Sequence, residues 1–264
     1  MSIFLNKIVW VTGASSGIGK EICVQIANQG GILVLSARNE TVLNEFKKTL
    51  LNEAKHLVLA IDLEQNSHFP DLANTVIQHF GRIDFLFNNG GLSQRSEASE
   101  TSMEVDRKIM EINYFGNIAL TKAVLPFMQK QGGGHITVIS SIAGKFGFYL
   151  RSAYSASKHA LHGFYESLAL EEAKNKIHIT IACPGKINTP ISTNALTGTG
   201  DKHGLMDHNQ ETGMPVELCV KQLLKAVELK KREVLIGNKE IKAVTLKRFF
   251  PNLFWKVIRK QSAT

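Results

Sequence analysis

The stretch that decides the fold is Lys7-Ile8-Val9-Trp10-Val11-Thr12-Gly13-Ala14-Ser15-Ser16-Gly17-Ile18-Gly19. Its first half is a short apolar run, which is typical of a buried strand in a parallel sheet. Its second half is rich in glycine and leads into a helical stretch from Lys20 to Gln29. Such a turn lets the backbone approach a diphosphate, which then lies at the positive N-terminus of the helix. The stretch therefore predicts a strand–turn–helix unit that binds a dinucleotide.

These glycines are spaced as Gly-x-x-x-Gly-x-Gly, whereas the general dinucleotide fingerprint is Gly-x-Gly-x-x-Gly. Taken alone, the three glycines could simply turn the chain. The strand before them and the helix after them favour the nucleotide-binding interpretation.

Outward from this stretch, apolar strand-like runs alternate with amphipathic helical stretches, a pattern typical of a parallel sheet covered by helices. Strands are predicted at 7–12, 32–36, 56–61, 83–87, 135–140, 177–182 and 233–236. Helices are predicted at 18–29, 39–53, 67–80, 103–130, 154–174 and 215–230. The predicted fold is α/β: a single doubly wound, Rossmann-like domain over residues 1–240, with a seven-stranded parallel sheet and helices on both faces. A basic amphipathic tail follows at 241–264.

Tyr154 and Lys158 are candidates for acid/base chemistry. They are four positions apart, so on a helix they share one face. A free phenol titrates near pH 10, and a neighbouring cation favours its ionised form, which brings proton transfer closer to neutral pH. The pair alone is a weak signal, because a half-buried Tyr and a solvated Lys often have this spacing by chance.

Further motifs follow in a fixed order, and together they resemble the short-chain dehydrogenase/reductase family from about residue 6 to residue 237. After Thr12 to Gly19 come Asp62-Leu63, Asn88-Asn89-Gly90-Gly91, Asn113, Ser141, Tyr154, Lys158 and Pro184-Gly185-Lys186-Ile187-Asn188-Thr189. Gly90 stands where the family usually has Ala, a change that removes no functional side chain. Residues 88–96 and 156–164 look like the dehydrogenase/reductase member 7 subgroup of this family.

The resemblance implies a catalytic set of Asn113, Ser141, Tyr154 and Lys158. Tyr154 would give a proton to a carbonyl oxygen or take one from an alcohol, while Lys158 would lower its pKa and hold the nicotinamide ribose. Ser141 would hold the substrate oxygen, and Asn113 would anchor a water that links Lys158 to solvent. Ser and Asn are common in turns and caps, so only their spacing from Tyr154 singles out these two.

The resemblance also implies contacts with a nicotinamide dinucleotide. The residues expected to make them are Gly13, Ser15, Ser16, Gly17, Ile18, Gly19, Arg38, Asp62, Leu63, Asn89, Tyr154, Lys158, Pro184, Gly185, Ile187 and Thr189. Asp62 is expected to meet the adenine, although a cap at the end of a strand explains this carboxylate equally well.

The end of the second predicted strand favours NADP(H). An acidic residue there would bind both ribose hydroxyls and repel a 2′-phosphate. The chain instead reads Leu35-Ser36-Ala37-Arg38-Asn39, and a guanidinium suits bidentate binding of phosphate. A solvated cation at a helix start is the alternative interpretation of Arg38.

Residues 186–215, called the lid segment below, are rich in Gly, Thr, Asn, His and Asp and lack regular periodicity. Long irregular segments in compact domains are often functional, and the resemblance implies that this one covers the substrate; a floppy surface loop is the alternative. The residues Phe146, Phe148, Tyr149 and Leu150 could line an apolar pocket, or pack against the lid segment or a partner subunit. We expect an apolar ketone, aldehyde or alcohol as substrate.

Composition narrows the class of protein. The 264 residues are 44% hydrophobic, enough for a packed core, and no apolar run approaches the roughly 20 residues that span a bilayer. The N-terminus enters the first predicted strand at once, which leaves no room for a signal peptide. Three widely spaced cysteines, Cys23, Cys183 and Cys219, argue against a disulfide framework, so a cytoplasmic protein is expected. His159 and His162 have no third ligand nearby in sequence, and no metal site is predicted.

The net charge of +8 is uneven, because residues 216–264 hold 12 of the 31 Lys and Arg but 4 of the 23 Asp and Glu. In the tail, aromatic and aliphatic residues alternate with cations, and Pro251 divides it into two short pieces. This pattern suits peripheral contact with an anionic membrane. Packing of the apolar residues on the body or on a neighbouring subunit is the somewhat favoured alternative. No nucleic-acid motif accompanies the cations, so nucleic acid is not an expected partner.

The sequence therefore predicts an oxidoreductase that transfers a hydride between NADP(H) and a carbonyl or alcohol, with Tyr154 as general acid/base. By resemblance, residues 103–130 and 154–174 would join subunits into a homo-oligomer, a dimer or tetramer. The rival hypothesis is a non-catalytic nucleotide sensor or membrane-docked regulator on the same fold. The joint presence of Asn113, Ser141, Tyr154 and Lys158 favours the enzyme.

Overall fold

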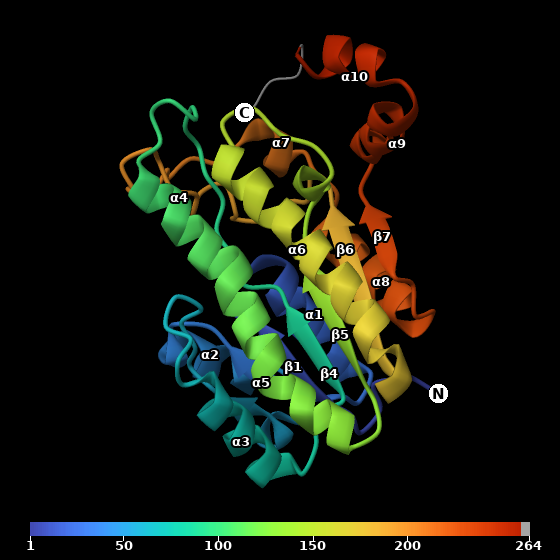
Figure 1. The fold of residues 1–264 in the computed structure, drawn as a ribbon. Helices are drawn as coiled ribbons and strands as arrows, with labels where there is room; N and C mark the ends of the chain where they lie inside the picture. The colour runs from blue at the N-terminus through green and yellow to red at the C-terminus, as the bar shows by residue number, and fades with distance from the viewer. Residues whose placement is uncertain (260–264) are drawn as a thin grey trace.

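The computed structural model describes residues 1–259 and contains one seven-stranded sheet in the order β3-β2-β1-β4-β5-β6-β7 (Figure 1). Every neighbouring pair of strands is parallel. The strands are β1 (Ile8–Thr12), β2 (Ile32–Ser36), β3 (Leu57–Val58), β4 (Phe85–Asn88), β5 (Gly134–Ile139), β6 (Ile177–Pro184) and β7 (Glu233–Ile236). The predicted doubly wound α/β fold is confirmed. The third strand is much shorter than the predicted 56–61.

Helices cover both faces of the sheet (Figure 1). They are α1 (Gly17–Asn28), α2 (Glu40–Lys48), α3 (Phe69–Phe80), α4 (Met103–Met110), α5 (Gly116–Lys130), α6 (Ser152–Glu171), α7 (His208–Glu211), α8 (Val216–Glu228), α9 (Lys242–Phe249) and α10 (Pro251–Ile258). Short 3₁₀ turns lie at Glu53–Lys55, Ile142–Gly144, Glu172–Asn175 and Lys239–Ile241. The predicted helix at 39–53 ends at Lys48, and the predicted helix at 154–174 begins two residues early, at Ser152.

The predicted helix at 103–130 is interrupted by a π-helical turn at Glu111–Phe115, between α4 and α5. Such turns insert one extra residue per turn and are frequent at functional sites. Here the turn contains Asn113, the residue that the family resemblance places in the catalytic set. A periodicity of 3.6 cannot reveal this interruption, because the apolar residues continue on both sides of it.

Alternate residues of β1 build two hydrophobic layers, as expected for a strand buried on both faces. Val9 and Val11 pack into a cluster that includes residues of α1, α2 and α8. Ile8 and Trp10 pack into the opposite cluster, with residues of α3, α5 and α6. This packing holds the carboxyl ends of β1, β4, β5 and β6 in one row, below the lid segment (Figure 1). In open parallel sheets, ligands bind at this edge.

Candidate active site

The glycine turn leaves an open cradle between β1 and α1. Gly13 has φ +66° and Gly17 has φ +52°, a left-handed backbone that favours glycine. A Cβ on Gly19 would lie 2.2 Å from the Gly13 carbonyl oxygen, so this glycine lets the helix pack directly on the turn. The N-terminus of α1 therefore faces the cradle with unobstructed backbone N–H groups, which suits the diphosphate of a dinucleotide.

Asn89, after β4, clamps this turn from the side. Its Nδ2 donates to the carbonyl oxygens of Thr12, at 3.0 Å, and Gly13, at 3.4 Å. In return, Thr12 Oγ1 accepts hydrogen bonds from the backbone N–H groups of Asn89 and Gly90, both at 3.0 Å. These four hydrogen bonds fix the glycine turn to the end of β4. Asn89, a predicted cofactor residue, therefore helps to shape the cradle.

A cavity of about 220 Å³ runs from this cradle along the carboxyl edge of the sheet to α6 and the lid segment. Eleven of the predicted cofactor residues line it: Gly13, Ser16, Gly17, Ile18, Asn89, Tyr154, Lys158, Pro184, Gly185, Ile187 and Thr189. The catalytic candidates Ser141, Tyr154 and Lys158 line it as well. The structure thus brings together residues from the first turn, β5, α6 and the end of β6. Their convergence from distant positions is what the order of motifs predicted.

Five predicted cofactor residues lie outside the lining of this cavity: Ser15, Gly19, Arg38, Asp62 and Leu63. Leu63 is a core residue, and its Cδ1 would lie 2.7 Å from a Cβ placed on Gly90. Asp62 Oδ1 accepts a hydrogen bond from the Glu64 N–H at 3.0 Å, the local cap that was the alternative interpretation of this carboxylate. Arg38 is exposed just beyond the carboxyl end of β2, and no ion pair involves it within residues 1–259.

Tyr154 lies in the first turn of α6 and is only 8% exposed. Burial raises the pKa of its phenol, and a hydrogen bond with Ser141 and the charges of Arg151 and Arg95 lower it less. The expected lowering of this pKa by Lys158 is therefore wrong: desolvation dominates, and the cations that act on the phenol are arginines. The buried phenol therefore keeps its proton at neutral pH.

Lys158 lies one turn after Tyr154, with its Nζ 5.7 Å from the centroid of the Tyr154 ring. The ammonium donates to the Ile139 carbonyl oxygen at 2.8 Å, at the end of β5. Burial lowers the pKa of Lys158 to about 8. The side chain is thus anchored under the cavity, where one hydrogen bond to the backbone leaves two N–H donors to serve a ligand.

Ser141 and Asn113 hold the backbone around these two side chains. Ser141 Oγ donates to the Pro184 carbonyl oxygen at 3.3 Å and accepts from the Ala143 N–H at 3.1 Å. Asn113 is fully buried: Oδ1 accepts from the Leu92 N–H at 2.7 Å, and Nδ2 donates to Leu92 O and Ser157 Oγ. Asn113 does not line the cavity. Its role as the anchor of a water stays a prediction.

A buried cluster of charged side chains lies beside Tyr154 and was not predicted from the sequence. Arg95 Nε donates to Asp207 Oδ2 at 2.9 Å, and Arg151 Nη2 donates to the same oxygen at 2.9 Å. Asp207 belongs to the lid segment, whereas Arg151 immediately precedes α6. The backbone supports the same contact, because the N–H groups of Arg95 and Leu196 bond across to Leu196 O and Ser93 O. The lid segment is therefore fastened to the body at Asp207 and at Leu196.

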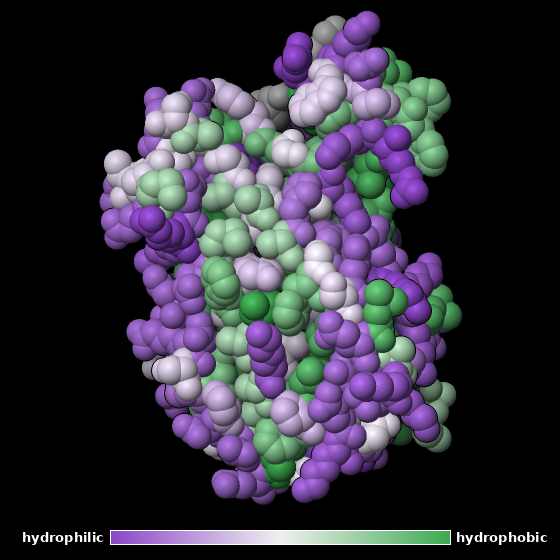
Figure 2. All heavy atoms as spheres, viewed as in Figure 1, coloured by the Kyte–Doolittle hydropathy of each residue, from purple (hydrophilic) through white to green (hydrophobic). Residues whose placement is uncertain are grey.

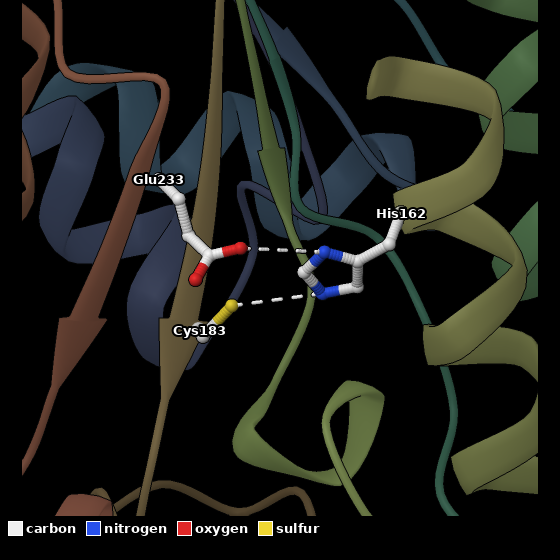
Figure 3. Close-up of side chains that lie close together, drawn as sticks. All are labelled: His162, Cys183 and Glu233. Carbon is white, nitrogen blue, oxygen red and sulfur yellow. Dashed lines mark hydrogen bonds and ion pairs between the residues drawn. The ribbon is translucent and has the colours of Figure 1, made fainter. Parts of the chain in front are cut away.

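A second cluster consists of the buried His162 and Cys183 and the exposed Glu233 (Figure 3). His162 Nε2 lies 3.7 Å from Cys183 Sγ, and His162 Nδ1 lies 3.6 Å from Glu233 Oε2. All three residues are of types that bind metal ions. They are far apart in the sequence, so their proximity could not be predicted from it. The ammonium of Lys145 already bonds both Glu233 and His162 Nδ1, and burial raises the pKa of the Cys183 thiol to about 12. A local cation and a protonated thiol oppose metal binding, so we assign the cluster to packing.

The apolar residues between Ser141 and Tyr154 divide between two roles. Phe148 lines the cavity, together with Leu92, Ile142 and Ile191. Phe146 is buried against Phe254 of α10, with ring centroids 5.1 Å apart. Tyr149 is exposed, and its hydroxyl donates to Glu97 Oε1 at 2.6 Å. Of these aromatic residues, Phe148 thus provides the expected apolar lining, whereas Phe146 packs against the tail.

Comparisons with known proteins show to which family the chain is similar. The model of the short chain dehydrogenase family matches residues 7–199. A dehydrogenase/reductase SDR family protein 7-like of Drosophila melanogaster is 37% identical over 263 residues, covering 97% of this chain and 81% of its own. Dehydrogenase/reductase SDR family member 7B of Rattus norvegicus is 39% identical over 266 residues, covering 97% and 82%. The predicted resemblance to the member 7 subgroup is confirmed.

Solved structures share the fold. A short-chain dehydrogenase from Streptomyces avermitilis has a TM-score of 0.83 at 27% identity, covering 97% of this chain and 98% of its own. A short-chain dehydrogenase/reductase from Burkholderia phymatum in complex with NAD has a TM-score of 0.83 at 22% identity, covering 96% of each chain. An alcohol dehydrogenase from Thermococcus sibiricus complexed with 5-hydroxy-NADP has a TM-score of 0.75 at 21% identity, covering 88% and 97%. The cradle, the ordered motifs and these relatives lead to one conclusion: the chain belongs to the short-chain dehydrogenase/reductase family of oxidoreductases.

Proposed function

We propose that this protein transfers a hydride between NADP(H) and an apolar carbonyl compound or its alcohol, with Tyr154 as general acid/base. One observation carries the proposal: Ser141, Tyr154 and Lys158 line the same cavity as the glycine cradle. The cradle suits the diphosphate of a dinucleotide. It depends on glycine, because a Cβ at Gly13 would lie 2.7 Å from Asn89 Nδ2 and collide with it. A bound nicotinamide supplies or accepts the hydride.

The chain itself supplies the proton and the position. Tyr154 would donate its phenolic proton to the carbonyl oxygen during reduction, or take a proton from the alcohol during oxidation. Ser141, which hydrogen-bonds Tyr154, would hold the substrate oxygen beside the phenol. Lys158 would bind the ribose with the N–H donors that Ile139 leaves available. Leu92, Ile142 and Phe148 would exclude water from the substrate, which favours an apolar one.

The preference for NADP(H) rests on Arg38. Its exposed guanidinium lies beyond β2, beside the strand that carries the glycine turn, and residues 35–39 hold no carboxylate that would repel a phosphate. Charge complementarity therefore supports a ligand with a 2′-phosphate. Homo-oligomers are typical of the family, and we extend the proposal to this chain through α5 and α6, whose outer face carries scattered apolar residues (Figure 2).

Oxidation of NADPH and of NADH, each measured with a panel of apolar ketones and aldehydes, tests the proposal. We expect turnover with at least one carbonyl and a higher kcat/KM with NADPH. Turnover that prefers NADH would refute the cofactor assignment and leave the enzyme intact. Tight NADPH binding without turnover on a broad panel, in both directions, would favour a nucleotide sensor instead.

A further inference from the structure

The tail, described by the structure over residues 241–259, packs against the body of the protein with one side. Phe254 is buried against Phe146, and Ile241, Val244, Leu246 and Ile258 pack around this pair. Polar bonds hold the same side: Lys247 Nζ donates to the Lys145 carbonyl oxygen. Just before the tail, Glu240 Oε1 accepts a hydrogen bond from the Lys186 N–H. The packing interpretation of the tail is thus correct for its inner side, and the tail has a defined position.

The outer side of the tail exposes large apolar residues. The side chains concerned are Phe249 (64% exposed), Phe250 (62%), Leu253 (50%), Trp255 (51%) and Val257 (42%). Figure 2 shows apolar atoms gathered on the outer side of this projection, which stands away from the sheet. Single exposed apolar residues are normal, but five within nine positions form a patch that marks an interaction surface.

Cations are interspersed with these apolar residues in the sequence of the tail, which contains no acidic residue. Residues 241–264 contain six Lys and Arg and no Asp or Glu. Lys242, Arg248, Lys256 and Arg259 are exposed, and none of them takes part in an ion pair within residues 1–259. The surface therefore attracts a partner that is both apolar and anionic.

We propose that the outer side of residues 242–259 binds the surface of an anionic phospholipid bilayer. Trp and Phe side chains suit the boundary between headgroups and acyl chains, and Lys and Arg around them bind acidic headgroups. A second copy of the chain is a poorer partner, because a two-fold interface on this patch would bring cations against cations. Within residues 1–259 no helix is long and apolar enough to cross a membrane.

The tail also adjoins the cavity. Phe254 contacts Phe146, whose ring stacks on Phe148 at 4.8 Å, and Phe148 lines the cavity. Membrane binding would therefore bring the cavity near the bilayer surface, where an apolar carbonyl compound partitions. This consequence rests on the proposed function, whereas lipid binding itself does not.

Co-sedimentation of the full chain with vesicles tests the inference without any enzyme assay. Vesicles of phosphatidylcholine alone are compared with vesicles in which about a third of the lipid is phosphatidylserine. We expect binding to the anionic vesicles only, and a loss of at least tenfold in partition for Phe249→Ser/Trp255→Ser and for Arg248→Glu/Lys256→Glu. All four residues are exposed, so the variants should keep the unfolding temperature of the wild type.

Matched controls lie on exposed positions of α8, away from the tail and from the proposed subunit interface: Leu218→Ser for the apolar pair and Lys221→Glu for the charged pair. Both controls should bind as the wild type does. Equal partition of tail variants and wild type, or no binding of the wild type to anionic vesicles, would overturn the proposal. A wild type that ignores vesicles but dissociates into monomers when Phe249 and Trp255 are replaced would instead assign the patch to a second copy.

Discussion

Arg95 and Asp207 form a buried ion pair that joins the body of the protein to the lid segment over the cavity. Arg95 Nε lies 2.9 Å from Asp207 Oδ2, and each side chain is 1% exposed. Arg151, next to α6, shares the same carboxylate. One carboxylate thus fixes the lid segment and offsets two cations that lie beside the general acid candidate.

The substitution Asp207→Asn should lower the free energy of unfolding by about 3–5 kcal/mol, because it leaves two buried guanidinium groups without a counter-charge. Removing this negative charge should also lower the pKa of Tyr154, which Arg151 and Arg95 already lower. Urea unfolding measures the first effect, and the alkaline limb of the pH–rate profile measures the second. Asp201→Asn, an exposed position in the same segment, should change stability by less than about 0.5 kcal/mol. Equal stability of the two variants would contradict the role given to Asp207.

The substitution Arg38→Ala should weaken the binding of NADPH roughly ten- to hundredfold, the range expected for the loss of charge-assisted hydrogen bonds. NADH, which lacks the 2′-phosphate, should bind the variant as it binds the wild type. Quenching of intrinsic fluorescence by each nucleotide gives both affinities. Lys48→Ala, at the exposed end of α2, controls for the loss of a nearby cation. A parallel loss of affinity for both nucleotides would show that Arg38 does not read the phosphate.

The substitution Gly19→Ala should destabilise the chain by roughly 1–3 kcal/mol, because the new Cβ would collide with the Gly13 carbonyl oxygen at 2.2 Å. Gly163→Ala is the matched control within a helix: nothing lies within 4 Å of its Cβ, and the position is exposed. This control should stabilise the chain by up to about 1 kcal/mol through helix propensity. Thermal and urea unfolding of both variants measure the two opposite signs. Similar effects of the two substitutions would refute the close packing assigned to the glycine turn.

Stability should fall on acidification between pH 7 and pH 5, in part because of His135. Burial lowers the pKa of this side chain to about 3. Below pH 6.5 the imidazole is therefore protonated in the unfolded chain but stays neutral in the folded chain. The stability that its neutral form gives is full above pH 6.5 and declines as the pH falls, by about 2 kcal/mol at pH 5.

The variant His135→Asn should therefore unfold with a weaker pH dependence than the wild type, measured in urea at several pH values. His79→Asn, an exposed position at the end of α3, should retain the dependence of the wild type. If His135→Asn keeps the full pH dependence, the neutral buried imidazole is not its source.

The sequence predicted those parts of the fold that follow from local patterns. Residues 7–19 alternate between two buried faces and then turn on glycine, so β1, α1 and the cradle could be read directly. The family resemblance, which rests on the order of the motifs, predicted that Ser141, Tyr154 and Lys158 would meet. The π turn at Asn113 and the short β3 could not be predicted, since tertiary packing decides both.

The environment of the site was equally out of reach. Arg95 and Asp207 are 112 residues apart, and neither has a pattern in the sequence that marks it as buried. The pKa of Tyr154 was predicted in the wrong direction, because spacing reveals a neighbouring cation but not the extent of burial. His162, Cys183 and Glu233 likewise meet only through the register of β6 and β7 with α6.

The central claim is that Tyr154 transfers the proton, and one comparison tests it most directly. NADPH oxidation with the best carbonyl substrate is measured for the wild type, for Tyr154→Phe and for Tyr149→Phe, a control at an exposed tyrosine five positions earlier. We predict that Tyr154→Phe loses at least about a hundredfold in kcat while its NADPH affinity is retained, and that Tyr149→Phe keeps its rate. Turnover by Tyr154→Phe close to that of the wild type would contradict the account.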